Sequence, residues 1–138
     1  MLPELAIHFD AWKLICAYKR PDVLAWHTPN GEKRDPRTAA RLQSMGVVRG
    51  VADLVLVVEG RCHFIELKTT RGHLSRDQEN FRCDAERAGA AYHVARSTED
   101  VARIMSDIGA SRVVFTFSAC GGPETHNTSS PRGAEAPA

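Results

Sequence analysis

Two short apolar segments joined by Glu59-Gly60 constrain this chain more than any other feature. Val51–Val58 (VADLVLVV) and Cys62–Lys68 (CHFIELK) have the apolar composition of strands, and a two-residue connection between them favours a β-hairpin. Side chains alternate between the faces of a strand, so a three-residue turn would move one strand's side chains to the other face. The length of the turn therefore decides which residues meet.

The two-residue turn predicts a cluster of three charged side chains on one face. Val58 would face Arg61, and Asp53 would then face Glu66, with Cβ atoms about 4.5–5.5 Å apart. Lys68 lies two residues beyond Glu66 and points to the same face. Two carboxylates this close repel each other, and a Mg²⁺ or Mn²⁺ ion held by carboxylate oxygens and water would relieve the repulsion. The alternative is a surface aspartate beside an ordinary cross-strand Glu–Lys ion pair.

The overall composition predicts one soluble globular domain. The 138 residues suffice for a single core, and 43% hydrophobic with 25% charged residues is ordinary for a folded protein. A formal charge of +1 excludes a general basic field, but residues 19–50 carry seven basic against three acidic side chains. That excess predicts either a phosphate-facing surface or a solvated face. The seven are Lys19, Arg20, Lys33, Arg34, Arg37, Arg41 and Arg49.

Several classes of protein are disfavoured by what the sequence lacks. The four cysteines form no C-x-x-C pair, which argues against a zinc site or a disulfide framework. No apolar run reaches membrane-spanning length, and the N-terminus lacks the features of a signal peptide. We therefore expect a cytoplasmic protein with reduced cysteines and no membrane association.

Hydrophobic periodicity and end signals predict the order helix, strand, helix, hairpin, helix, strand, helix. This order indicates one α/β domain over residues 1–118, with helices covering a small mixed sheet. Arg112–Ser118 is a possible edge strand, and the Gly, Pro, Ser, Thr and Ala of residues 119–138 predict a disordered tail. Outside the hairpin, the expected elements are helices over Pro3–Tyr18, Pro36–Met45, Ser75–Ala88 and Ser97–Ile108, and strands over Val23–His27 and Ala91–Ala95.

The helix patterns also predict which side chains face the core. The first helix has Leu5, Phe9, Trp12 and Cys16 at helical spacing, and both tryptophans, Trp12 and Trp26, are expected in the core. The inward residues expected of the two later helices are Phe81, Ala85 and Ala88 in the third, and Val101, Ile104, Met105 and Ile108 in the fourth.

Glycines and polar residues around the charged cluster add to the pattern: Asn30-Gly31, Gly46, Gly50 and Asp53, then Phe64–Lys68 (FIELK), then Gly72-His73-Leu74-Ser75 and Gln78. In these residues the chain resembles the VRR-NUC family, the virus-type replication-repair nucleases of the PD-(D/E)xK superfamily. The resemblance runs from about Glu4 to Ile108, and small stand-alone members occur in bacteriophages and bacteria. It departs from the family at Ala52, where a proline is usual.

The resemblance implies a restriction-endonuclease-like fold and a role for each residue of the cluster. Asp53 and Glu66 would be metal ligands, with the Leu67 carbonyl as a third oxygen. Lys68 would position or activate the attacking water and balance phosphate charge.

More distant residues would join the site by the same resemblance. Gln78 matches a helix glutamine that faces the site, although it also fits a capping box with Ser75. Glu4 matches an acidic residue of the first helix, although an acidic first turn is favoured in any helix. His8 follows one turn later, where the family often has glutamine. Asn30-Gly31 is foremost a turn and secondarily a DNA contact.

Taken together, the resemblance implies a Mg²⁺- or Mn²⁺-dependent DNA endonuclease, in a bacterial or phage-infected cell. It would be structure-selective and cut branched DNA, including Holliday junctions as a homodimer. Two alternatives stay open: a general or flap- and end-directed nuclease of the same fold, and a DNA-binding module without catalysis.

Overall fold

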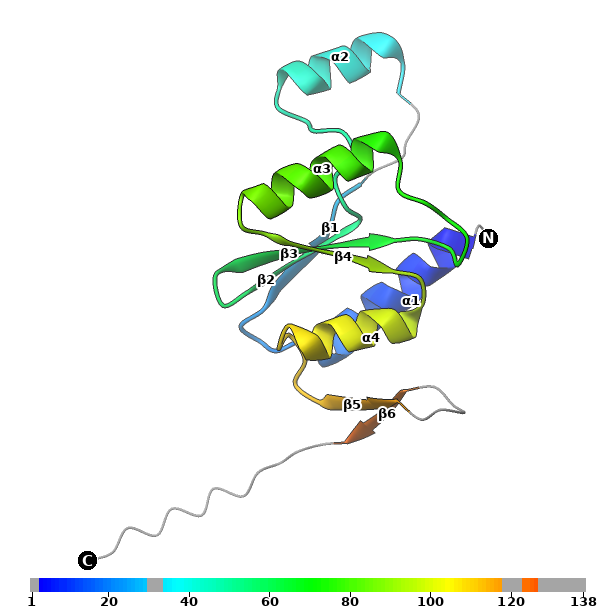
Figure 1. Ribbon diagram of the computed structural model, residues 1–138, viewed down its shortest axis with the longest axis vertical. Helices are drawn as coiled ribbons and strands as arrows, with labels where there is room; N and C mark the ends of the chain where they lie inside the picture. The colour runs from blue at the N-terminus through cyan, green and yellow to red at the C-terminus, as the bar shows by residue number, and fades with distance from the viewer. Residues whose placement is uncertain (1–2, 30–33, 118–122, 127–138) are drawn as a thin grey trace, which may run out of the picture.

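The computed structural model describes residues 3–29, 34–117 and 123–126, and their elements form three layers. A sheet of four strands lies in the middle, with α3 (Arg76–Arg87) on one face and both α1 (Pro3–Tyr18) and α4 (Thr98–Asp107) on the other (Figure 1). The α/β class and the predicted order of elements are confirmed. Asn30-Gly31 lies outside the described residues.

The sheet has the strand order β1-β2-β3-β4 and is mixed, as expected. β1 (Leu24–His27), β2 (Leu54–Val58) and β3 (Arg61–Leu67) are antiparallel neighbours. β4 (Ala91–Ala95) runs parallel to β3, and α3 makes the crossover between them. The parallel pair matters for function because it brings the residues after β4 to the same end of the sheet as the residues after β3.

The predicted hairpin register is confirmed. Val58 pairs with Arg61 and Leu54 pairs with Ile65, which is the alignment that opposes Asp53 to Glu66. The turn has positive φ at both central residues, 50° at Glu59 and 78° at Gly60, as in type I′ hairpin turns. Such turns suit the twist of the flanking strands, so the turn and the register support each other.

The ends of the sheet differ from the prediction in two places. β2 begins at Leu54 rather than Val51, and Ala52 is fully buried just before the strand. The expected edge strand is β5 (Val114–Phe117), which pairs with β6 (Pro123–His126) in a separate two-stranded ribbon. β6 falls within the segment expected to be disordered; residues 118–122 and 127–138 lie outside the described residues.

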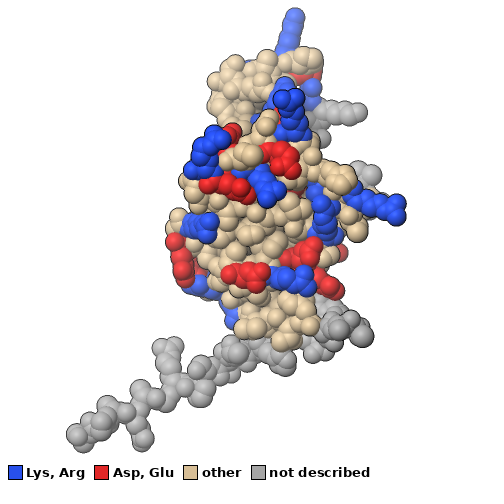
Figure 2. Space-filling model, viewed as in Figure 1, with Lys and Arg blue, Asp and Glu red and all other residues tan. Residues whose placement is uncertain are grey.

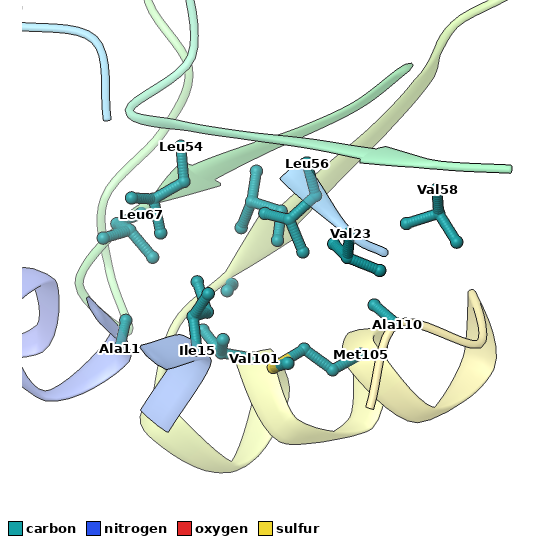
Figure 3. Packing of buried hydrophobic residues seen from close by; sticks show 12 residues of the cluster. Ala11, Ile15, Val23, Leu54, Leu56, Val58, Leu67, Val101, Met105 and Ala110 are labelled. Atoms are coloured by element: carbon teal, nitrogen blue, oxygen red, sulfur yellow. The ribbon is translucent and has the colours of Figure 1, made fainter. Parts of the chain in front are cut away.

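The hydrophobic core lies between the sheet and the α1–α4 layer (Figure 3). The sheet residues that join this core alternate along β2 and β3, because every second side chain faces it; Val55 and Glu66, between them, are also buried but point to the opposite face. The inward residues predicted for α4 are confirmed: Val101 and Met105 are fully buried, and Ile104 and Ile108 pack against the core. The largest fully buried side chains are Ile15, Leu54, Leu56, Ile65, Met105 and Val101.

The predicted core face of α1 is largely wrong. Leu5 and Phe9 are 46% and 51% exposed and Cys16 is exposed, whereas Ala11 and Ile15 are fully buried. The helix packs against both α4 and β3, and the small Ala11 allows that close approach.

Two further burial predictions need correction. Trp12 packs against the core as expected, but Trp26 is 42% exposed because it lies on the edge strand β1. On α3, Ala85 is buried while Ala88, at the helix end, is exposed.

Within the described ranges, no helix is long and apolar enough to cross a membrane, and Cys16, Cys62 and Cys83 are free thiols.

α2 (Pro36–Ser44) stands apart from the three layers, beyond α3 in Figure 1. Asp35 caps it: the carboxylate accepts from the backbone N–H groups of Arg37 and Thr38, at 3.0 Å each. None of its nine residues, all of them described, is buried. The helix therefore adds little to the core and leaves its side chains free for contact with another molecule.

Candidate active site

The end of the hairpin holds Asp53 in place through the backbone. Asp53 immediately precedes β2, and its Oδ2 accepts a hydrogen bond from the Leu67 N–H at 2.8 Å. The Asp53 carbonyl accepts from the Thr28 N–H at 2.8 Å, which ties the same residue to the end of β1. Burial raises the pKa of Asp53, although the Leu67 hydrogen bond and the nearby His8 and Lys68 lower it. Asp53 is thus fixed from both neighbouring strands.

Glu66 is an ionisable residue that is almost completely buried, with only 3% of its surface exposed. Burial and, after it, the charge of Asp53 raise its pKa to about 8, while Lys68 acts in the opposite direction. Its Oε2 atom is buried and has no hydrogen-bond partner among the described residues. A buried oxygen of this kind has the surroundings that a bound cation would complete.

Gln78 completes the predicted capping box and also joins α3 to Glu66. Its Oε1 accepts from the Ser75 N–H at 2.8 Å, and Ser75 Oγ accepts from the Gln78 N–H at 3.2 Å, which completes the capping box. Its Nε2 donates to Glu66 Oε1 at 2.7 Å. The same side-chain amide therefore caps the N-terminus of α3 and orients the Glu66 carboxylate.

The other predicted residues also lie at the cluster. Lys68 Nζ is 3.7 Å from Glu66 Oε1, and the Lys68 side chain is 13% exposed. Glu4, in the first turn of α1, is close enough for its charge to raise the pKa of both Asp53 and Glu66. His8 packs edge-on against His27 with ring centroids 5.1 Å apart, and burial lowers its pKa.

These residues line a surface cleft of about 930 Å³. Its floor contains Asp53, Glu66 and Lys68, and its walls come from the first turn of α1, from α2 and the loop after it, and from the start of α3. Arg34 and Arg49 lie on the α2 side of the cleft. Figure 2 shows basic side chains projecting at the α2 end, whereas acidic and basic side chains alternate over the middle of that face.

Gly50 sets the distance between the loop before Asp53 and the start of α3. A Cβ atom at this position would lie 2.3 Å from the Asp77 carbonyl oxygen and 2.7 Å from the Gln78 nitrogen. The φ of Gly50 is +77°, which other residues adopt rarely. The glycine that stands three residues before the aspartate thus allows the helix carrying Gln78 to reach the site.

Two contributors to the site were not predicted. The hydroxyl of Tyr92, on β4, is buried and has no hydrogen-bond partner within the described part of the chain; burial and the charges of Glu66 and Asp53 raise its pKa. Arg96 follows β4 and contacts the segment after Lys68. Only the parallel pairing of β3 with β4 brings them close, and no local sequence signal marks such a pairing.

The donor set fits a hard divalent cation with a hydrated shell. Asp53, Glu66 and the Leu67 carbonyl offer oxygen alone, which is what Mg²⁺ and Mn²⁺ prefer. In the described ranges, no group of three or more His, Cys, Asp or Glu side chains could hold a metal ion. Two carboxylates and a carbonyl would leave the other positions to water and substrate, as is usual for Mg²⁺.

Comparison with solved structures places this fold among VRR-NUC domains. A structure described as a VRR_NUC domain protein superposes with a TM-score of 0.65 at 19% identity, covering 78% of this chain and 88% of its own. Another, described as a VRR_NUC domain, has a TM-score of 0.52 at 18% identity, covering 76% and 96%. No family model and no curated protein matches the sequence. The fold expected from the resemblance is therefore confirmed.

Proposed function

We propose that this chain is a metal-dependent nuclease that hydrolyses phosphodiester bonds in DNA. The observation that carries the proposal is Glu66, a buried carboxylate with an unpartnered oxygen among the described residues, beside Asp53 on the floor of a cleft. Holding a half-buried carboxylate beside a buried one is costly unless a cation offsets their charge. The VRR-NUC fold supports the same conclusion.

Asp53, Glu66 and the Leu67 carbonyl would hold a Mg²⁺ or Mn²⁺ ion. When bound, the ion would supply Lewis acidity at the phosphate and lower the pKa of a coordinated water. The chain keeps both carboxylates ready for this task, since the Leu67 N–H holds Asp53 and the Gln78 amide holds Glu66. Such prior positioning lowers the barrier because the groups need not reorganise during the reaction.

Lys68 would act on the substrate directly. Its ammonium lies beside Glu66 at the cleft floor, where it can stabilise the negative charge that develops on the phosphate and position the attacking water. Glu4 would contribute at the mouth of the cleft, where its negative charge favours a cation near Asp53.

The basic side chains around the cleft support DNA as the partner. Arg34 and Arg49 line the cleft, and α2 carries the exposed Arg37 and Arg41. Arginine contacts to phosphates position a nucleic acid without reading its sequence, which favours selection by DNA structure. We therefore propose branched DNA, including four-way junctions, as the preferred substrate.

A homodimer would suit that substrate, because two-fold symmetry presents two sites to opposed strands. Large apolar side chains are exposed at the α2 side of the cleft: Met45, outside the cleft lining, is 74% exposed, and Val47 and Val48, within the lining, are 44% and 56% exposed.

A cleavage assay tests the activity. Labelled four-way junction, flap, linear duplex and single strand are incubated with the wild type and Asp53→Asn, in Mg²⁺, Mn²⁺ or a chelator. We expect metal-dependent cleavage that the variant lacks, with junctions cut in preference to linear duplex. Absence of cleavage on every DNA would contradict the nuclease, and binding without cleavage would favour a non-catalytic module. A monomer that cuts linear DNA equally well would instead indicate a general nuclease.

A further inference from the structure

One arginine outside the cleft lining holds the segment that joins β3 to α3. Arg96 follows β4, and its Nη1 atom donates to the carbonyl oxygens of Thr69 at 2.7 Å and Gly72 at 2.6 Å. Its own backbone N–H donates to Asp100 Oδ2 at 2.9 Å. The start of α4 thus anchors Arg96, and Arg96 anchors the segment.

The held segment is tightly folded against Lys68. The Gly72 N–H donates to the Thr69 carbonyl at 3.1 Å, so the carbonyls that bind Arg96 belong to one turn. A Cβ atom on Gly72 would lie 3.1 Å from Thr69 Oγ1 and 3.4 Å from Lys68 Cδ. The path of this turn therefore limits where the Lys68 side chain can lie.

Both ends of the segment carry a residue that touches the same carboxylate oxygen. At one end Lys68 Nζ lies 3.7 Å from Glu66 Oε1, and at the other Gln78 Nε2 donates to that atom at 2.7 Å. Ser75, which caps the helix that carries Gln78, follows the turn by three residues. A shift of the turn would move both partners of Glu66.

The geometry points to Arg96 as a positioning residue: by holding the turn from Thr69 to Gly72, it keeps Lys68 and the start of α3 in place against Glu66. Hydrogen bonds from a guanidinium to carbonyls are charge-assisted and therefore stronger than neutral ones. The expected effect on cleavage rests on the proposed function, whereas the ordering of the turn by Arg96 does not. Arg96 acts through Lys68 and Gln78 and need not touch the DNA.

Steady-state kinetics test the consequence for cleavage. Arg96→Met removes the guanidinium but keeps an unbranched stem, and Arg96→Lys keeps a cation with a different donor geometry. Arg103→Met is the matched control, because Arg103 also contacts Asp100 and lies on α4. We expect kcat to fall about tenfold to 100-fold in Arg96→Met with KM changed less than about twofold, since small misplacements have such costs. Arg96→Lys should be intermediate and Arg103→Met near wild type.

Three kinetic results would overturn the proposal. One is a wild-type kcat in both Arg96 variants; another is a raised KM at constant kcat, which would make Arg96 a DNA contact. The third is an equal loss in Arg103→Met, which would indicate a general effect on α4. If Arg96→Met does not fold, Arg96→Lys alone decides between these outcomes.

Hydrogen exchange tests the positioning without any activity. In Arg96→Lys we expect the Gly72 amide to exchange at least about tenfold faster than in the wild type, while amides of β2 and β3 stay protected. Unchanged exchange at Gly72 would overturn the proposal even if cleavage falls. Faster exchange at Gly72 in a protein that cleaves no DNA would uphold the positioning and reject the nuclease.

Discussion

Replacing Glu66 by glutamine separates the cost of burying this carboxylate from its proposed role. Glu66 is 3% exposed, and burial together with Asp53 raises its pKa from 4.5 to about 8. A group whose pKa is higher in the folded state than in the unfolded state stabilises the folded protein. This stabilisation is complete at pH values below the pKa of the unfolded state. That contribution is lost as the pH rises from 4.5 to 8. In the absence of divalent metal, the wild type should therefore become less stable across this range.

The size of the effect follows from the difference between the two pKa values. Each pKa unit corresponds to about 1.4 kcal/mol, so the rise from 4.5 to about 8 sets an upper bound of about 5 kcal/mol. Two effects make the gain from Glu66→Gln smaller than this bound. Asp53 titrates together with Glu66 and carries part of the cost, and the glutamine buries an amide N–H group where Oε2 was. We expect Glu66→Gln to stabilise the metal-free protein by about 2 kcal/mol at pH 8, or about 10 °C in Tm.

Thermal unfolding in a chelator at pH 5 and pH 8 measures this difference, and Glu99→Gln, on the exposed start of α4, is the control. At pH 5 the wild type and Glu66→Gln should melt within a few degrees of each other. Adding Mn²⁺ at pH 8 should raise the Tm of the wild type but not that of Glu66→Gln, because a ligand stabilises only the protein that binds it. A lower Tm for Glu66→Gln at pH 8 in chelator, or equal stabilisation of both proteins by Mn²⁺, would refute the reasoning.

Three further predictions concern other parts of the chain. Lys68→Ala should leave folding and DNA binding nearly intact while cleavage falls about 10²-fold, and near-normal turnover would reduce Lys68 to a strand ion pair. Gly50→Ala should lower the free energy of unfolding by about 3 kcal/mol or more, because its Cβ would meet the Asp77 carbonyl oxygen at 2.3 Å; an unchanged Tm would contradict this contact. His63 Nδ1 lies 3.2 Å from His93 Nε2, and burial lowers the pKa of both histidines, so their contribution to stability is complete above pH 6.5 and is lost below it. Replacing both by glutamine should flatten that acid dependence in thermal melts, and an unchanged dependence would assign it to other groups.

The hairpin illustrates what could be predicted from the sequence. The turn Glu59-Gly60 and the order of helices and strands were both correct, because each depends on neighbours within a few residues. The register that opposes Asp53 to Glu66 follows from the turn alone. The capping box of Ser75 with Gln78 is local in the same way and was also correct.

Side-chain burial was predicted less well wherever it depends on a distant element. Periodicity placed Leu5 and Phe9 on the inner face of α1, but the contacts of that helix with α4 and β3 turn Ala11 and Ile15 inward instead. Trp26 has an apolar side chain on an edge strand, where one neighbour is absent from the described sheet. A hydrophobic pattern predicts that a face is buried, but its partner decides which residues form that face.

The sequence by itself determined the elements, the hairpin register and the cluster of Asp53, Glu66 and Lys68, since local turn chemistry and strand alternation suffice for these. Only the tertiary structure decided that Gln78 reaches Glu66, that the start of α3 packs on Gly50, and that Arg96 holds the turn after Lys68. The physical reason is that these contacts join residues 12 to 28 positions apart across a parallel strand pair and a helix. Their geometry exists only once the layers have packed.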